Sequence, residues 1–120
     1  MALEKLSADS SARANVELQL ALVELLYDTG RPEAALKRAD DLIAAVADSP
    51  EAHLWRARVL LQLNRVDEAA RAAEQAVKLQ AESPAAHNLL VRIYQKQGRT
   101  KDAVQEAQWL RDYQRRIESR

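Results

Sequence analysis

The strongest constraint on the fold is a set of residues that recur at an interval of 34 along the chain. The recurring sets are Gly30, Asn64 and Gly98; Ala35, Ala69 and Ala103; Pro50 and Pro84; and His53 and His87. An internal period of this size is typical of stacked repeats, in which each unit buries its apolar face only against its neighbours. We therefore expect function to lie on an extended surface and not in a catalytic pocket.

Residues that typically start or end helices occur at regular positions along the chain. The residues expected to close a helix in the left-handed conformation are Gly30, Asn64 and Gly98. Ser49 and Ser83 each precede a proline, which predicts an N-cap followed by the first helical residue. Thr100 is expected to cap the last helix. The predicted helices span residues 12–28, 33–47, 50–63, 67–81, 84–97 and 101–117.

Composition agrees with an all-helical chain that has a small core. Apolar residues make up 48% of the 120 residues but aromatic residues only 4%, and much of the apolar share is alanine. The interior must therefore rest on close contacts between helices more than on large side chains. Alanine and leucine are strong helix formers, and no stretch alternates as a strand does. The fold class is predicted to be all-α.

Small residues in the second helix of each unit, and larger ones in the first, point to a known repeat. The small column is Ala35 and Ala39, then Ala69 and Ala73, then Ala103 and Ala107. With Leu90, Tyr94, Gly98, Ala103 and Leu110, the third unit resembles the tetratricopeptide repeat, a 34-residue helix-turn-helix. The resemblance implies a right-handed α-solenoid of antiparallel helix pairs, a TPR-like superhelix, with repeats at 16–49, 50–83 and 84–117 and a tail at 118–120.

Several positions depart from the family pattern. Where the pattern has a large first residue, this chain has Gln19, His53 and His87, and Arg56 replaces a leucine that the pattern buries. The aromatic residue of the second helix is replaced by Ala39, Ala73 and Ala107. The closing proline is replaced by Ala47 and Ala81. These departures bear on the superhelical geometry and not on the fold.

Residues 1–15 leave two readings open. Ala2 to Leu6 followed by Ser7 to Ser11 looks like the close of a preceding second helix and its loop, which would make the chain part of a longer repeat protein. Leu3 and Leu6 could instead fold back on Leu18 and Leu22 and cap the first repeat.

The resemblance also implies where a partner would bind, because first helices of such repeats typically line a concave groove that holds a peptide or helix. The expected groove residues are Glu17, Leu20, Glu24, Tyr27 and Asp28; Glu51, Leu54, Trp55, Arg58 and Leu61; and Asn88, Leu89, Arg92, Gln95 and Lys96. An aromatic residue beside an arginine, as at Trp55, is enriched at binding hot spots. The other reading is that Trp55 packs against the neighbouring helix as core. The residues in the places of the family's chaperone-tail clamp are Leu20, Glu24, Trp55, Ala85 and Leu89, and none matches it.

Charge drifts along the repeats although the net charge is zero. The first repeat has seven acidic and three basic residues, the second five and five, and the third three and seven, so their formal charges are −4, 0 and +4. We expect a bipolar protein or peptide partner, with its acidic part near Arg58, Arg92 and Lys96 and its basic part near Glu17, Glu24 and Asp28. The alternative is that Glu24 pairs with Arg58 across adjacent helices.

The same gradient permits a second class of function, a self-assembling module in which the last repeat of one copy stacks on the first of another. Arg111 argues against this stack, because it occupies the place of Ile43 and Val77 and so suits a terminal cap. Trp109, Tyr113 or both are expected to lie exposed on the last helix and to mark a contact with another chain or domain. A monomer or weak self-association is the expected state.

Other functions find little support. The chain has no cysteine and no phosphate-binding glycine loop, and His53 and His87 recur without a third ligand, so we expect no metal, no cofactor and no catalysis. The arginines of the last helix are interrupted by Asp112 and Glu118, and the balanced charge argues against nucleic acid. No signal peptide or membrane span is recognised, so a cytoplasmic protein is expected.

Overall fold

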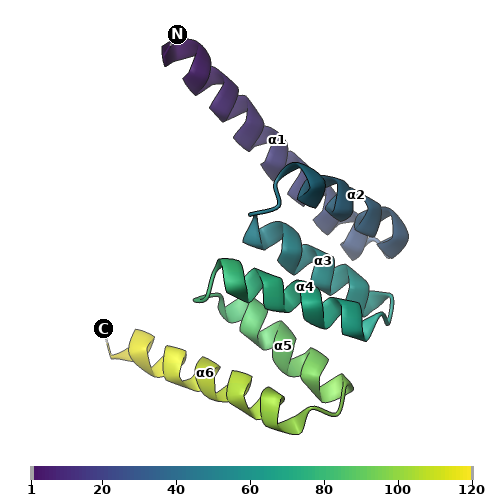
Figure 1. The fold of residues 1–120 in the computed structure, drawn as a ribbon, viewed down its shortest axis with the longest axis vertical. Helices are drawn as coiled ribbons and strands as arrows, with labels where there is room; N and C mark the ends of the chain where they lie inside the picture. Colours follow the sequence, from purple (N-terminus) through teal and green to yellow (C-terminus); the bar gives the residue numbers. More distant parts are fainter. Residues whose placement is uncertain (1, 120) are drawn as a thin grey trace.

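A computed structural model describes residues 2–119 of the chain and the side chains of residues 13–119. The helices are α1 (Ala2–Asp28), α2 (Pro32–Ala45), α3 (Pro50–Gln62), α4 (Val66–Leu79), α5 (Pro84–Lys96) and α6 (Thr100–Glu118). Within residues 2–119 there is no strand. The predicted all-α solenoid of antiparallel helix pairs is confirmed, with five of the six helices close to their predicted bounds (Figure 1).

Most helix ends form as the turn chemistry predicts. Ser49 and Ser83 accept hydrogen bonds at 3.3 Å from the backbone amides of Ala52 and Ala86, as N-caps do. Asn64 has a φ of 61°, the left-handed conformation that closes α3, and it is one of the few residues other than glycine that adopt it readily. The prediction that Thr100 caps α6 is wrong. The N-cap is Arg99, whose guanidinium instead reaches the Asp102 carboxylate.

The first helix differs from its prediction at its start. It begins at Ala2 and not near residue 12, so the loop expected at residues 7–11 is absent and the helix continues through the serine-rich segment. Serine has only moderate helix propensity, but Ala8, Ala12 and Ala14 lie within and after the serine-rich segment and favour the helix. The helix is straight (Figure 1), and its first half does not fold back on the repeats. The side chains of Leu3 and Leu6 lie outside the described ones.

Each helix packs on the next one along the chain, and the first helices of the repeats also meet. α1 contacts α3 and α3 contacts α5, whereas no contact joins α2 with α4 or α4 with α6 among residues 2–119. The layer of first helices is therefore the more closely packed, inner side of the stack. The radius of gyration is 16.1 Å. A compact chain of this length has about 13–14 Å, so the stack is elongated.

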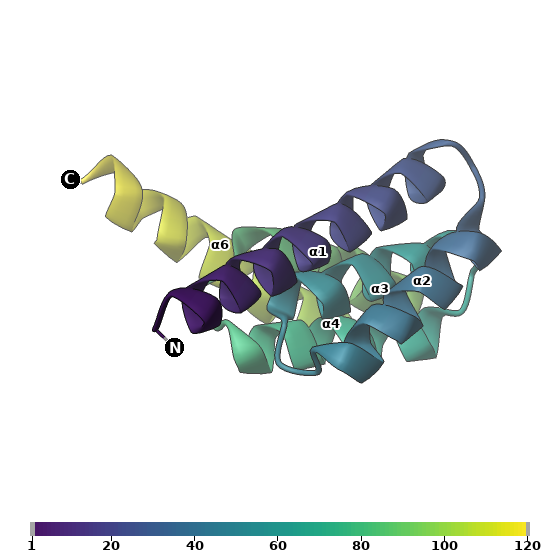
Figure 2. The same cartoon turned by 90° about the horizontal axis from the view of Figure 1, so that it is seen from above.

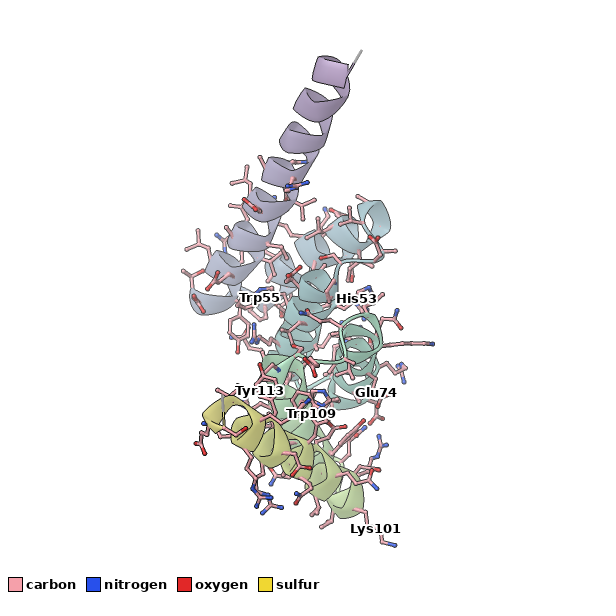
Figure 3. All side chains as sticks on the ribbon, turned by 90° about the vertical axis from the view of Figure 1, so that its left-hand side faces the viewer. His53, Trp55, Glu74, Lys101, Trp109 and Tyr113 are labelled. Carbon is pink, nitrogen blue, oxygen red and sulfur yellow. The ribbon has the colours of Figure 1, made fainter. Side chains whose placement is uncertain are left out.

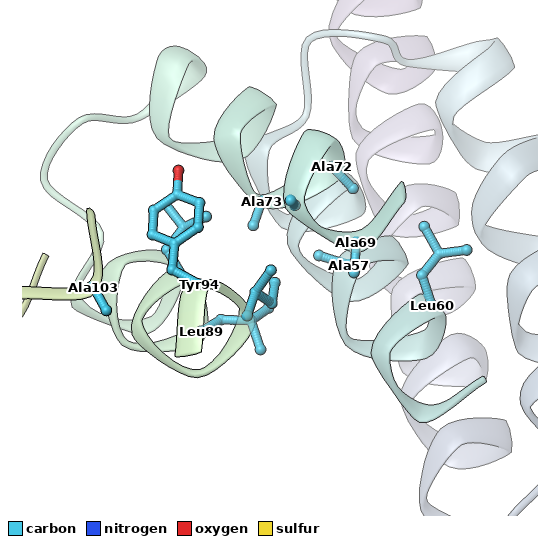
Figure 4. Close-up of a cluster of buried hydrophobic side chains, with 11 residues drawn as sticks. Ala57, Leu60, Ala69, Ala72, Ala73, Leu89, Tyr94 and Ala103 are labelled. Carbon is cyan, nitrogen blue, oxygen red and sulfur yellow. The ribbon is translucent and has the colours of Figure 1, made fainter. Parts of the chain in front are cut away.

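Two clusters of buried side chains hold the stack together. The smaller joins Val23, Ala35 and Ala39 of the first repeat to Val59 of the second. The larger lies between the second and third repeats, where alanines of α4 meet Leu89, Ile93 and Tyr94 of α5 (Figure 4). Ala69 and Ala73 have no exposed surface, so α4 lies close against α3 and α5.

Two histidines secure the loops that join the repeats. The Nε2 atom of His53 lies 2.8 Å from the carbonyl oxygen of Ala47, and that of His87 lies 2.7 Å from the carbonyl oxygen of Ala81. Because a carbonyl only accepts hydrogen bonds, both Nε2 atoms carry the hydrogen. Ala47 and Ala81 stand where the tetratricopeptide pattern has its closing proline. The histidines thus supply the loop constraint that the missing prolines would give.

Candidate binding groove

The inner face of the stack contains a hollow of about 270 Å³ at the junction of the three first helices. Its lining residues are Tyr27, Arg58, Leu61, Gln62, Leu89, Arg92 and Lys96. They come from α1, α3 and α5, because positions 34 residues apart take equivalent places on successive first helices. The hollow combines apolar walls with three cationic side chains.

Trp55 forms an aromatic cluster beside this hollow. Its ring meets the ring of Tyr27 edge to face, with centroids 5.6 Å apart, and the guanidinium of Arg58 lies 4.5 Å from its ring centroid. Figure 3 shows Trp55 next to α1. Trp55 is half-buried, so it both packs between the first two repeats and borders the groove. The contact with Trp55 orients Arg58.

The cations of the hollow have no ion-pair partner among the described side chains. None of the ion pairs among the side chains of residues 13–119 includes Arg58, Arg92 or Lys96. The alternative in which Glu24 pairs with Arg58 is therefore not the arrangement of this structure. Glu24 lies exposed on α1, outside the hollow.

The predicted groove residues divide into those that the structure gathers and those that it does not. The hollow gathers Arg58, Leu61, Leu89, Arg92 and Lys96, together with Tyr27. The residues that do not line it are Glu17, Leu20, Glu24, Asp28, Glu51, Leu54, Trp55, Asn88 and Gln95. In this group Glu17, Glu24, Asp28, Glu51, Asn88 and Gln95 are exposed, and Leu20, Leu54 and Trp55 are half-buried.

Leu89 and Gln62 refine the predicted groove. Leu89 is only 4% exposed and belongs to the larger core cluster, so it forms the floor of the hollow. Gln62 was missed by the sequence analysis. Its Nε2 donates to the carbonyl oxygen of Tyr27 at 3.3 Å. The repeat could have found it, because Gln62 shares its register with Asp28 and Lys96, which were both selected.

The expectation that Trp109, Tyr113 or both lie exposed on α6 is not met. The ring of Trp109 stacks on that of His87 at a centroid distance of 3.7 Å and on that of Tyr113 at 5.1 Å. Both aromatic residues are half-buried as a result (Figure 3). His87 itself is 5% exposed, and its Nδ1 contacts a carboxylate oxygen of Glu106. This group of side chains fastens α5 to α6.

A metal site and a membrane span each require particular features of the described residues. Among the side chains of residues 13–119, no group of three or more histidine, cysteine, aspartate or glutamate residues is placed to hold a metal ion. No helix in the part of the chain that the structure describes is long and apolar enough to cross a membrane.

The sequence profile of the family described as "Tetratricopeptide repeat" matches residues 20–84 and 57–116. The chain belongs to the tetratricopeptide repeat family. Its fold is similar to that of a point mutant of MamA, with a TM-score of 0.73 at 18% identity over 82% of this chain and 72% of that one. MamA AMB-1 gives the same TM-score and identity over 86% of this chain and 61% of its own length. No curated protein sequence matches.

Membership in this family places the chain among scaffolds for contacts between proteins, which are typically not catalytic. The matched region covers all three repeats, including the first helices that form the hollow. The likeness to MamA supports the fold.

Proposed function

We propose that the inner face holds a segment of a partner protein, with an acidic, apolar stretch of that segment seated in the hollow of Arg58, Arg92 and Lys96. The observation that carries this proposal is the presence, around one apolar depression, of three cations that form no ion pair with the side chains of residues 13–119. Leucine and tyrosine walls suit an apolar side chain, and the surrounding cations suit carboxylates on the same segment. Complementary charge would mainly fix the direction of the segment and speed its capture.

The segment is bipolar in this proposal. Glu17, Glu24 and Asp28 are exposed along α1, while Arg92 and Lys96 are exposed along α5. A partner crossing the inner face would place basic residues toward α1 and acidic residues toward α5. The reverse orientation would bring like charges together at both ends.

Short synthetic peptides with an apolar centre, one acidic half and one basic half test this function by fluorescence anisotropy. We expect Arg58→Glu to weaken binding at least about tenfold, which corresponds to about 1.4 kcal/mol, because it removes both a cation and its contact with Trp55. The matched control is Arg71→Glu, which makes the same charge change at an exposed position of α4 that lies outside the hollow.

Two comparisons make the result decisive. Peptides whose two halves are both acidic should bind less tightly than the bipolar peptide, and higher salt should weaken the bipolar peptide's binding. Equal losses from Arg58→Glu and Arg71→Glu, with both variants folded by circular dichroism, would show that only net charge matters and would remove the groove from the explanation.

A further inference from the structure

The last repeat exposes, at the end of the stack, a surface that is buried by the next repeat in the first and second repeats. A hollow of about 300 Å³ opens on α5 and α6. Its lining residues are Val91, Gln95, Thr100, Ala103, Val104 and Ala107. In the first and second repeats the corresponding surface is covered by the next repeat, through the contacts of α2 with α3 and of α4 with α5.

Side-chain exposure shows how far this face is open. Val104 is 56% exposed, whereas Ala70, in the same place one repeat earlier, is 3% exposed. Val91 is half-buried, whereas Val23 and Ala57 in its register have no exposed surface. The apolar character of the column therefore continues to the end of the stack, where no further helix among residues 2–119 covers it.

The opposite end of the stack carries the complementary surface. Leu18 and Leu25 of α1 are 55% and 56% exposed. Ala52 and Val59, in the same places on α3, are 1% and 0% exposed, and Val59 packs against the first repeat. Leu18 and Leu25 thus stand where a preceding repeat would cover them, and they lie on one stripe of α1 because they are seven residues apart.

We propose that the uncovered face of α5 and α6 binds the exposed stripe of α1 of a second copy of this chain, head to tail. The contact repeats the junction already present twice within the chain. The facing repeats have formal charges of +4 and −4, so the ends attract each other. The hollow on α5 and α6 shares no lining residue with the hollow of the inner face.

The internal junctions also say which charged groups meet. At the second junction, Asp67 accepts a hydrogen bond from Gln97 Nε2 at 2.8 Å. Moving this contact along by one repeat brings Lys101 beside Thr29 of the second copy, whose neighbour is Asp28. Figure 3 shows Lys101 at the end of the molecule opposite the start of α1. Lysine and aspartate thus face each other at the contact between copies.

Helix lengths agree with this pairing. α1 and α6 have 27 and 19 residues, whereas the other four have 13 or 14. Second helices pack antiparallel on the following first helices, so the N-terminal extension of α1 would lie along the C-terminal extension of α6 of the preceding copy. Both extensions leave the stack on the same side (Figure 2). Ile117 on the α6 extension is 46% exposed and available for that contact.

Arg111 limits the strength of the contact without preventing it. It replaces Val77 of the preceding repeat, and its guanidinium donates to Gln108 of its own helix. Val91, Ala103, Val104 and Ala107 remain apolar around the hollow. Covering Arg111 removes water from its guanidinium, which offsets part of the attraction to the acidic repeat and favours reversible association over a permanent interface.

Analytical ultracentrifugation of the chain at rising concentration tests the proposal. The weight-average mass should exceed the monomer mass of 13.5 kDa and increase with concentration, and added salt should lower it. Leu25→Arg and Val104→Arg should each abolish this increase. Gln105→Arg is the matched control, because it adds the same side chain at the next exposed position of α6, outside the hollow.

A mixing experiment identifies the head-to-tail geometry. Val104→Arg keeps an intact first end and Leu25→Arg keeps an intact last end, so an equimolar mixture should form a dimer that does not grow further. Where an arginine variant fails to fold by circular dichroism, the glutamine variant at the same position takes its place.

Three outcomes would overturn the proposal. They are a wild-type chain that stays monomeric throughout, an end-face variant that associates as the wild type does, or a mixture that stays monomeric. A monomeric wild type would assign the open face to a further repeat or domain. Arg58→Glu should associate like the wild type, so failure of the groove and failure of the end contact are distinguishable.

Discussion

The two histidines occupy the same place in successive repeats but have different surroundings. His53 is half-buried and makes one hydrogen bond, to the loop carbonyl of Ala47. His87 is 5% exposed, bonds the corresponding carbonyl of Ala81, contacts Glu106 and stacks on Trp109. The additional partners of His87 both lie on α6.

The difference teaches how a terminal helix is kept in place. α4 is held between α3 and α5, and in the register of Glu106 it carries Ala72, which is 4% exposed and packs in the larger core. Among residues 2–119, α5 is the only helix that α6 contacts. Its polar and aromatic contacts with His87 replace the apolar contacts that a following repeat would give. The contacts of His87 with Glu106 and Trp109 thus hold α6 against α5.

The largest effect should come from overpacking the middle repeat. Ala69→Leu should lower the free energy of unfolding by about 1–3 kcal/mol, because Ala69 has no exposed surface and a larger side chain separates the packed helices. Ala103→Leu, in the same register, should cost less than Ala69→Leu because its side chain can extend into the open hollow of the last repeat. Urea unfolding of both variants measures the difference. Equal losses would contradict the contrast between enclosed and terminal pairs.

The two histidines give a smaller but more direct comparison. His87→Ala should destabilise the protein by about 1–2 kcal/mol, because it leaves the half-buried Glu106 carboxylate without this partner and removes the ring from under Trp109. His53→Ala, which loses one partly exposed hydrogen bond, should cost less than about 1 kcal/mol. If His53→Ala proved the more harmful in the same unfolding assay, the loop bond and not the α5–α6 fastening would be the main role of this position.

Tyr94 gives a smaller expected effect than His87, together with a dependence on pH. Its hydroxyl donates to Glu74 at 3.0 Å across the last junction, and Tyr94→Phe should cost about 0.5–1.5 kcal/mol at neutral pH. Burial, and next the hydrogen bond to Glu74, raise the pKa of Tyr94 to about 12. The unfolded chain loses this proton near pH 10, whereas the folded chain keeps it up to about pH 12.

The stabilisation from Tyr94 is therefore complete below about pH 10 and disappears as the pH rises through about 12. The difference in unfolding free energy between the wild type and Tyr94→Phe should shrink over this interval. A difference that stays constant to pH 12 would show that the hydroxyl does not titrate differently in the two states.

The fold could be predicted because its signals are local and repeated. Asn64 and the serine caps act through nearby backbone groups, and three copies of one pattern confirm one another. The start of α1 could not be predicted, because no capping or breaking residue marks where that helix begins. At α6, Arg99 and Thr100 both suit a helix start, and only the backbone geometry shows that α6 begins at Thr100 after Arg99.

The sequence predicted which positions of the first helices line the groove, but not how their side chains pack within it. Periodicity placed Arg58, Arg92 and Lys96 on one face, where the structure puts them around one hollow. It could not show that Leu89 forms the floor or that Arg58 rests on Trp55, because those contacts depend on the angle between neighbouring helices. Trp109 was misjudged for a related reason. Its partner, His87, lies 22 positions earlier and is brought near only by the packing of α5 on α6.

Contacts that run only from one helix to its neighbours, with the inner layer alone linking every other helix, also have a mechanical meaning. There is no shared centre to hold the two ends at a fixed angle, so each junction acts as a short elastic joint in a lever 52 Å long. A small rotation between α3 and α5 is carried in full to the tip of α6. The width of the inner face then depends on the stiffness of the two junctions between repeats. A contact that stiffens either junction changes the curvature of the whole stack.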